Sequence, residues 1–326
     1  MTIKFSTVLG IFGSPSDRFV SSGYRPPVPL EKMFEDTKKV GELTGIELVG
    51  TWHINENNVD EIKKYIKKYD LKVSMIIPDI FAQARWGNGT FTSNDPKIRK
   101  DAINEVKKYM DIAPELGCDL LDLWFGQDGY DYSFQMDYIK SWNLLIDGIK
   151  ECANYRKDVR LGLEYKIKEP RTHCIVATVG KTLLLLREIN MDNVGLVLDV
   201  GHGFVAYENV AESIALAKMF GNKLFQLHLN DNYRLWDDDM MVSSVHVIEY
   251  LELLYWLKKT GYNGWYSLDI YPYRENGVEA ANESIGWLKS MMKALENTKD
   301  SEIEQVLSEG NATRSMNLVR TMLLKY

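Results

Sequence analysis

A run of three aspartates, Asp237, Asp238 and Asp239, lies near the end of the segment HLNDNYRLWDDDMM (228–241), which begins with His228. Neighbouring carboxylates repel one another, and bringing them together costs free energy unless water or a cation neutralises the charge. Side chains two residues apart in an extended segment share a face, so Asp237 and Asp239 would point the same way. The segment therefore indicates either a solvated acidic loop or part of a metal site.

Further acids, histidines and amides stand at or just after the ends of short apolar runs. They are His53 with Glu56, Glu164 with Lys166 and Glu169, Asp199 with His202, His228 with Asn230, and Asp269. A single strand-end aspartate often caps the next helix, and a single histidine is often structural, so each residue alone has an ordinary explanation. Together they offer oxygen and imidazole ligands, which suit Mg²⁺, Mn²⁺ or Co²⁺ better than a metal that prefers thiolates. The acids suffice for two divalent cations.

Eight strand-like runs alternate with eight runs of helical period. The strand-like runs are 4–13, 45–52, 72–78, 120–126, 159–166, 194–200, 223–230 and 265–271, and the helical runs are 30–43, 58–69, 98–116, 135–155, 177–189, 208–220, 246–260 and 278–295. This alternation predicts an α/β fold, a (β/α)8 TIM barrel over residues 1–298, followed by a short helical tail over residues 299–326. The functional site of such a barrel lies at the carboxyl ends of its strands, where the polar residues above would meet.

Composition narrows the possible partners. The 326 residues carry a net charge of −7, which disfavours nucleic acid as a partner. The three cysteines fit no metal or redox spacing and are expected to be reduced thiols. The N-terminus does not resemble a signal peptide and no run is long enough to span a membrane, so we expect a cytoplasmic protein without a membrane partner.

Seven short motifs resemble those of the xylose isomerase family, in the same order and at nearly the same spacing. They are GNGTFTSND (87–95), DLWFGQDG (122–129), EYKIKEPR (164–171), TVGKTL (178–183), VGHG (200–203), KLFQLHLND (223–231) and the aspartate triplet. The resemblance covers roughly residues 5–296. It implies a (β/α)8 barrel that acts as a metal-dependent aldose–ketose isomerase on a monosaccharide, assembled as a homodimer or homotetramer.

The resemblance also implies a role for each site residue. The metal ligands would be Glu164, Asp199, His202, His228, Asp237, Asp239 and Asp269, holding two divalent ions. Lys166 would stabilise the carbonyl oxygen of the sugar, with Asp237 also in a catalytic role, and His53, oriented by Glu56, would assist ring opening. Trp124, Phe81 and Phe12 would form aromatic walls around the sugar, and Glu169 and Asn230 would complete its binding site.

Some positions depart from the xylose isomerase pattern. Asp199 stands in place of a glutamate and His228 in place of an aspartate, so the metal centre is more similar to that of L-rhamnose isomerase. The set Glu164, Asp199, His228 and Asp269 also resembles the single-ion centre of ketose 3-epimerases. Tyr271 replaces a lysine, and the C-terminal arm is much shortened.

We therefore expect an aldose–ketose isomerase that moves hydrogen between C1 and C2 of an open-chain sugar by a metal-assisted 1,2-hydride shift. The alternatives are a ketose 3-epimerase or a partner-dependent sugar-modifying enzyme on the same barrel, and a barrel that binds sugar without turnover. A DNA-repair endonuclease is disfavoured by the acidic balance and by the lack of a multi-histidine zinc set.

Overall fold

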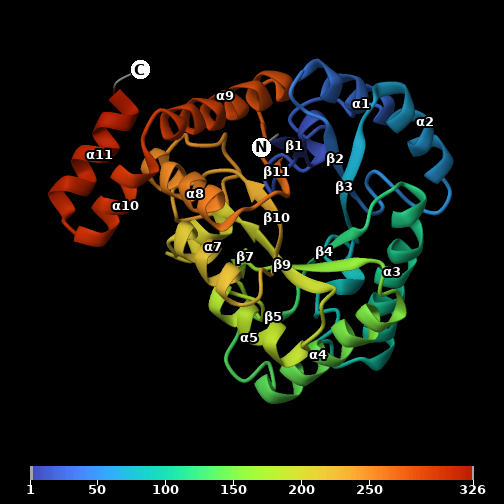
Figure 1. The fold of residues 1–326 in the computed structure, drawn as a ribbon. Coiled ribbons are helices and arrows are strands. Elements are labelled where there is room, and N and C mark those ends of the chain that lie inside the picture. The colour runs from blue at the N-terminus through green and yellow to red at the C-terminus, as the bar shows by residue number, and fades with distance from the viewer. Residues whose placement is uncertain (1–2, 325–326) are drawn as a thin grey trace.

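The computed structural model describes residues 3–324 and shows eight parallel strands in a ring (Figure 1). The ring consists of β1 (Lys4–Thr7), β2 (Gly45–Val49), β3 (Lys72–Ile77), β4 (Leu120–Trp124), β6 (Arg160–Glu164), β9 (Val194–Asp199), β10 (Leu224–Leu229) and β11 (Trp265–Leu268). Hydrogen-bonded neighbours follow the order β1-β11-β10-β9-β6-β4-β3-β2. Bridges from Phe5 to Leu43 and from Val8 to Glu47 bring β1 beside β2 and close the sheet. The predicted barrel is confirmed.

Helices surround the ring and cover its outer face. They are α1 (Leu30–Lys39), α2 (Val59–Tyr69), α3 (Pro96–Glu115), α4 (Tyr138–Tyr155), α5 (Val179–Ile189), α7 (Val210–Met219), α8 (Val247–Thr260) and α9 (Gly277–Glu296). Side-chain caps fix several of their starts: Asp95 accepts a hydrogen bond from the backbone N–H of Lys97 at α3, and Asn276 caps α9 in the same way. Such caps satisfy backbone donors that have no partner within the helix.

Several short elements were not predicted from the sequence. They are the 3-10 helices η1 (Leu9–Phe12) and η2 (Ala84–Trp86), the helix α6 (Val200–Val205), and a small antiparallel sheet of β5 (Gly129–Tyr130), β8 (Thr172–Cys174) and β7 (Lys168–Glu169). The C-terminal tail is helical as expected, but it forms two helices, α10 (Asp300–Glu309) and α11 (Ala312–Leu324). They are separated at Gly310, whose φ of 58° ends α10 in the left-handed conformation.

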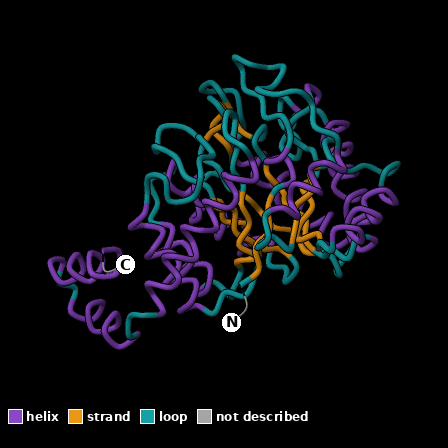
Figure 2. The backbone as a smooth tube through the Cα atoms, turned by 90° about the horizontal axis from the view of Figure 1, so that it is seen from above, coloured by secondary structure: helices purple, strands orange, loops and turns teal. Residues whose placement is uncertain are grey.

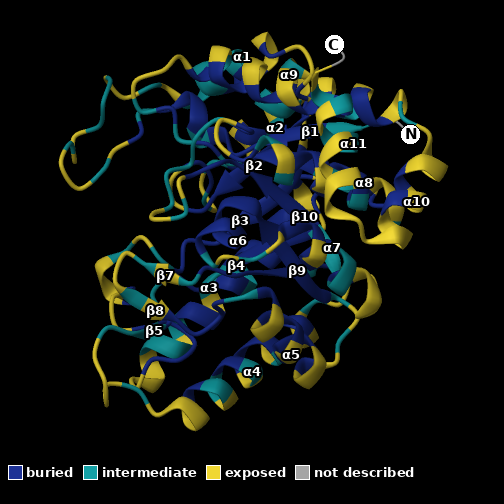
Figure 3. Cartoon of the chain, turned by 90° about the vertical axis from the view of Figure 1, so that its left-hand side faces the viewer, coloured by how far each residue is buried: buried dark blue, intermediate teal, exposed yellow. Residues whose placement is uncertain are grey.

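The loops that follow the strands gather at one end of the ring, and α10 and α11 project to one side (Figure 2). The interior is buried throughout (Figure 3). Apolar side chains of Val8, Val49, Met75, Leu120 and Val197 pack inside the ring, while a larger core lies between the ring and its helices. Cys118, Cys152 and Cys174 are buried free thiols. Within residues 3–324, no helix combines the length and apolar character that crossing a membrane requires.

Glycine inside the ring allows a close contact beneath the site, which generates a first prediction. A Cβ on Gly162 of β6 would lie 2.4 Å from Cγ2 of Val197, whose branched side chain has little freedom to move. Gly162→Ala should therefore destabilise the protein by about 1–3 kcal/mol, measured by urea unfolding. Gly180→Ala is the matched control, because a Cβ there meets no atom within 4 Å. It should be neutral or stabilising by up to about 1 kcal/mol; equal effects of the two variants would contradict this account.

Candidate metal centre and substrate cavity

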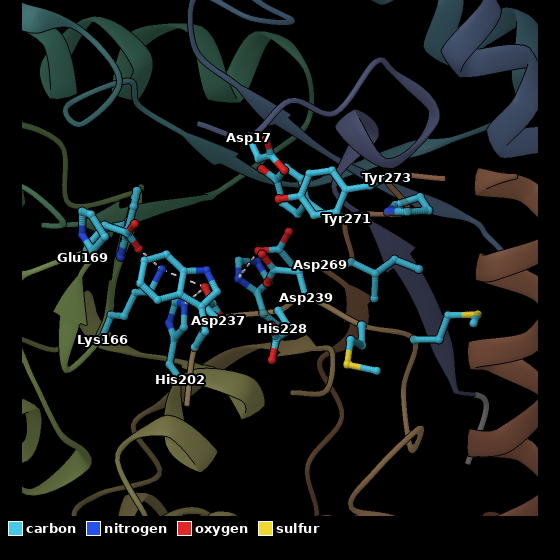
Figure 4. A pocket seen from close by; sticks show the side chains of 18 of the residues that line it. Asp17, Lys166, Glu169, His202, His228, Asp237, Asp239, Asp269, Tyr271 and Tyr273 are labelled. Atoms are coloured by element: carbon cyan, nitrogen blue, oxygen red, sulfur yellow. Dashed lines mark hydrogen bonds and ion pairs between the residues drawn. The ribbon is translucent and has the colours of Figure 1, made fainter. Parts of the chain in front are cut away.

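A cavity of about 920 Å³ opens at the carboxyl ends of the strands. It is lined by many of the residues predicted to form the site. Lys166, Glu169, His202, His228, Asp237, Asp239 and Asp269 are labelled in Figure 4, and Trp124 and Glu164 also line the cavity. These residues come from β4, β6, β7, β10, α6 and the loops after β6, β10 and β11. The closed ring is what brings together side chains that are more than a hundred positions apart in the sequence.

The imidazole of His228 marks the centre of the acidic cluster. Its Nδ1 lies 3.1 Å from Oε2 of Glu164, 3.6 Å from Oδ2 of Asp269 and 4.0 Å from Oδ2 of Asp199. The ring is 1% exposed, and within residues 3–324 its Nδ1 has no hydrogen-bond partner. A buried nitrogen that faces three carboxylate oxygens without a hydrogen bond is the arrangement expected of a metal ligand.

Glu47 on β2 fixes the orientation of this imidazole. Glu47 is not among the residues predicted from the sequence. The Nε2 of His228 lies 2.8 Å from Oε2 of Glu47, and Nε2 of Gln226 donates to Oε1 of Glu47 at 2.7 Å. Both Glu47 and Gln226 are fully buried. A carboxylate that accepts the Nε2 proton leaves the lone pair on Nδ1, which directs it at the acidic cluster. The residues present thus fit a divalent cation held by Glu164, Asp199, His228 and Asp269.

Asp199 combines a structural role with a place in the cluster. Its Oδ1 accepts a hydrogen bond from the backbone N–H of His202 and so caps α6, and its Oδ2 accepts one from Nδ2 of Asn230. Asn230 is fully buried and does not line the cavity, so the structure places it behind Asp199 rather than against a substrate. The expected substrate contact of Asn230 is therefore not supported by its position.

Asp122 on β4 is a second acid that the sequence analysis left unassigned. Asp122 lies close to two residues of the cluster: one ligand atom of each of Asp122, Glu164 and His228 lies within 4.8 Å of the other two. Asp122 is 1% exposed, and neither of its oxygens has a hydrogen-bond partner in the described part of the chain. Burial, and then the charge of Glu164, raises the pKa of Asp122 well above its usual value.

A second group of charges surrounds Lys166. Its Nζ pairs with a carboxylate oxygen of Glu169 and lies 2.7 Å from Oδ2 of Asp237. The same Asp237 oxygen is 3.2 Å from Nε2 of His202, whose Nδ1 lies 2.9 Å from the carbonyl oxygen of Tyr165. If Nδ1 carries the proton and donates to that carbonyl, the Nε2 lone pair points at Asp237, as a second metal site would require. Lys166, however, already supplies positive charge to that carboxylate.

Opposing effects of burial and charge set the pKa values of this group. Burial alone would lower the pKa of Lys166 and of His202, but the nearby carboxylates outweigh it and raise both pKa values well above their usual ranges. Burial would raise the pKa of Asp237, but Lys166 and His202 outweigh it and keep this carboxylate ionised. The Lys166–Asp237–His202 group is thus a charged cluster in the cavity wall.

The structure does not bring His53 and Glu56 together. The Nδ1 of His53 accepts a hydrogen bond from the backbone N–H of Val49. The imidazole of His53 is buried and does not line the cavity, and burial lowers its pKa to about 4. Glu56 is on the surface, where it lies 3.6 Å from Nζ of Lys108. The turn after β2, with Thr51 at a φ of 63°, turns Trp52 towards the cavity instead. The expected ring-opening pair is not supported by this geometry.

The predicted aromatic walls are present in part. Trp124 lines the cavity and Phe81 packs edge-on against it with ring centres 4.7 Å apart. Nζ of Lys166 lies 5.1 Å from the Trp124 ring centre. Phe12 is buried in η1 and does not line this cavity, because the chain turns into that helix directly after β1 and packs Phe12 in the core.

Fold and site together define a (β/α)8 barrel with a carboxylate–imidazole centre at the carboxyl ends of its strands. A family model described as "Xylose isomerase-like TIM barrel" matches residues 34–291, and the chain belongs to this family. It is 30% identical over 231 residues to the xylose isomerase of Thermus thermophilus. This alignment covers 68% of this chain and 59% of that relative. The xylose isomerase of Thermus caldophilus is 29% identical over the same length. The match thus spans less than two thirds of these relatives.

Solved structures with the same fold include sugar epimerases. A D-tagatose 3-epimerase-like protein superposes with a TM-score of 0.70 at 18% identity, covering 90% of this chain and all of that one. The 3-keto-D-glucoside 4-epimerase of E. coli has a TM-score of 0.69 at 17% identity, with 89% of this chain and all of that one covered. At these identities the likeness establishes the fold.

The hydrogen bond between Glu47 and His228 generates a prediction about metal affinity. Glu47→Gln removes the negative charge behind the imidazole and should weaken Mn²⁺ or Co²⁺ binding by about 10- to 100-fold, measured by titration calorimetry and by the visible absorption of bound Co²⁺. Gln226→Leu is the control, because it removes the other partner of Glu47 and leaves the contact with His228. Equal metal affinity in Glu47→Gln and the unaltered protein would rule out this role.

The buried acids make the stability of the metal-free protein depend on pH. Burial, and then the charge of Glu164, raises the pKa of Asp199 to about 6. Burial, and then the charge of Asp199, raises the pKa of Asp269 to about 7. At pH values between these and the usual pKa of about 4, the folded chain holds protons that the unfolded chain has released. The free energy of unfolding therefore falls as pH rises through this range.

Metal binding requires deprotonated ligands, so its stabilising effect should follow the opposite trend. We expect the Tm in chelator to fall between about pH 5 and pH 8, and the increase in Tm on adding Mn²⁺ to grow over the same range. Thermal unfolding followed by circular dichroism, with and without Mn²⁺, measures both. An increment that is constant or shrinks with pH would contradict the assignment of these acids as metal ligands.

Proposed function

We propose that this protein is a metal-dependent isomerase of an open-chain monosaccharide, converting an aldose to the corresponding ketose. The observation that carries the proposal is the buried ammonium of Lys166, which faces the cavity beside the Glu164–Asp199–His228–Asp269 centre. Membership in the xylose isomerase-like family supports an enzyme that acts on sugars. We further propose that the working form is a homodimer or homotetramer.

A divalent ion held by Glu164, Asp199, His228 and Asp269 would supply Lewis-acid polarisation of the sugar's oxygens. We propose a second ion near His202, Asp237 and Asp239, with Mn²⁺, Mg²⁺ or Co²⁺ as the candidates. The chemistry of these oxygen and imidazole donors supports such metals.

The other residues act directly on the substrate. Lys166, held by Asp237 and Glu169, would donate to the carbonyl oxygen where negative charge develops during the hydrogen transfer. Because Lys166 is buried, its charge acts in a medium that screens it less than water does. Trp124 would pack against the C–H face of the sugar and exclude water from the reacting atoms.

One observation favours a ketose 3-epimerase as the second candidate. Glu164 and Asp269 approach His228 from β6 and from the end of β11, and these strands are separated in the sheet by β9 and β10. Two acids on well-separated strands would flank a bound sugar and exchange a proton at C3 from either side. This reaction would use only the centre formed by Glu164, Asp199, His228 and Asp269, without Asp237 and Asp239.

The proposal predicts that divalent metal restores sugar conversion. After removal of metal by chelator, Mn²⁺, Co²⁺ or Mg²⁺ should restore aldose–ketose conversion in a panel of pentoses, hexoses and 6-deoxyhexoses, measured by chromatography. If no ion restores conversion of any sugar, the isomerase proposal fails. Asp237→Asn combined with Asp239→Asn separates the candidates, since an isomerase should lose at least about 100-fold in kcat. An epimerase should keep most of its turnover.

A further inference from the structure

The cavity extends well beyond the metal centre. Its volume of about 920 Å³ is near the upper end of the roughly 300–1,000 Å³ that hold drug-sized ligands, which are larger than one sugar ring. The acids and Lys166 form one part of the lining, and the remainder includes large apolar side chains. Three of these are strongly exposed: Phe19 at 79%, Trp52 at 49% and Trp236 at 45%. Large apolar side chains that remain open to water in one cavity commonly mark a binding surface.

One aromatic wall runs outward from the reacting groups. Two of its rings line the cavity, Trp124, which lies beside Lys166, and Trp52, and Phe81 packs edge-on against both from behind the lining. The ring centres are 4.7 Å apart between Trp124 and Phe81, and 5.9 Å apart between Phe81 and Trp52. The edge-on contacts hold the three rings in place, so the wall exists before any ligand binds.

A second aromatic wall comes from different loops and also leads outward. Tyr271 and Tyr273 follow β11 and lie above Asp239 and Asp269 in Figure 4, and Tyr24 packs on Tyr273 with ring centres 5.3 Å apart. The loop that carries Tyr24 is tied to the loop after β11, because the guanidinium of Arg25 donates to the carbonyl oxygens of Tyr273 and Glu275. The hydroxyl of Tyr24 donates to Asp17, which fixes the ring.

We propose that the outer part of the cavity binds a second ring, carried by the substrate sugar on a carbon away from the reacting carbonyl. The substrate class is then a two-ring compound with a free reducing end, whose second ring presents a flat apolar face to Trp52, as a glycosyl or an aryl group does. The proposal rests on the proposed function for the reaction at Lys166. The reacting end must remain unsubstituted there, because a glycosidic bond at C1 prevents the sugar from opening.

Direct binding tests the proposal independently of turnover. Titration calorimetry with the metal-loaded, full-length protein compares xylose with xylobiose and glucose with cellobiose. The 4-O-benzyl ethers of xylose and glucose, which leave C1 free, form the aryl arm. We expect the preferred two-ring ligand to bind about tenfold more tightly than its single sugar. The disaccharide and benzyl ether arms show which kind of ring the outer site takes. Equal affinities for one-ring and two-ring ligands in both arms would overturn the proposal.

Trp52→Ala tests whether the aromatic wall produces this preference, and Trp287→Ala is the matched control. Trp287 is a partly exposed tryptophan on α9 that does not line the cavity. The ratio of two-ring to one-ring affinity should fall towards one in Trp52→Ala and stay unchanged in Trp287→Ala. A ratio that Trp52→Ala leaves intact would overturn the proposal. Preferential two-ring binding without conversion of any sugar would instead refute the proposed function and leave the outer site standing.

Discussion

Three carboxylates, those of Glu164, Asp199 and Asp269, converge on the imidazole of His228 at a point that water barely reaches. Like charges held this close in a medium of low polarity destabilise the fold unless positive charge is placed among them. His202 supplies part of that charge, since its Nδ1 lies 3.1 Å from Oε1 of Glu164, and the directed Nδ1 of His228 fits a cation as the remainder. Much of the cavity wall is organised around this balance of charge.

The sequence alone was sufficient for the barrel and for nine of the residues that line its cavity. Eight apolar runs identified the eight strands, and the rule that barrel sites lie at strand ends selected Glu164, Lys166, His202, His228 and Asp269 without knowledge of their distances. The barrel could be predicted because the alternation of strand and helix is a strong pattern. The position of these side chains at the cavity could be predicted because polar groups that end apolar runs are conspicuous.

Glu47 and Asp122 escaped prediction for a physical reason. Each lies in the middle of a strand that is buried on both faces, so no alternation of polar and apolar residues shows which side points into the ring. The available signal was a charged residue inside an otherwise apolar run, in GIELV and LLDLW. A buried charge needs a partner, so such a residue indicates a buried ion pair or a metal ligand.

His53 and Phe12 lie outside the cavity because their orientation depends on turns that the sequence pattern does not reveal. A left-handed residue at Thr51 and a hydrogen bond from the backbone of Val49 keep the imidazole of His53 out of the cavity. The 3-10 helix after β1 buries Phe12 in the core. Position relative to a strand end is a property of the sequence, whereas the direction of the side chain beyond it depends on the conformation of one or two residues.

The contact between Glu47 and His228 joins β2 to β10, which are not neighbours in the sheet. Between them lie β1 and β11, and the junction of β1 with β2 is where the ring closes. The imidazole thus acquires its supporting carboxylate only when the first and last portions of the chain have met. A half-barrel fragment that contains His228 but not β2 lacks the carboxylate that orients the imidazole, so the complete site exists only in the closed ring.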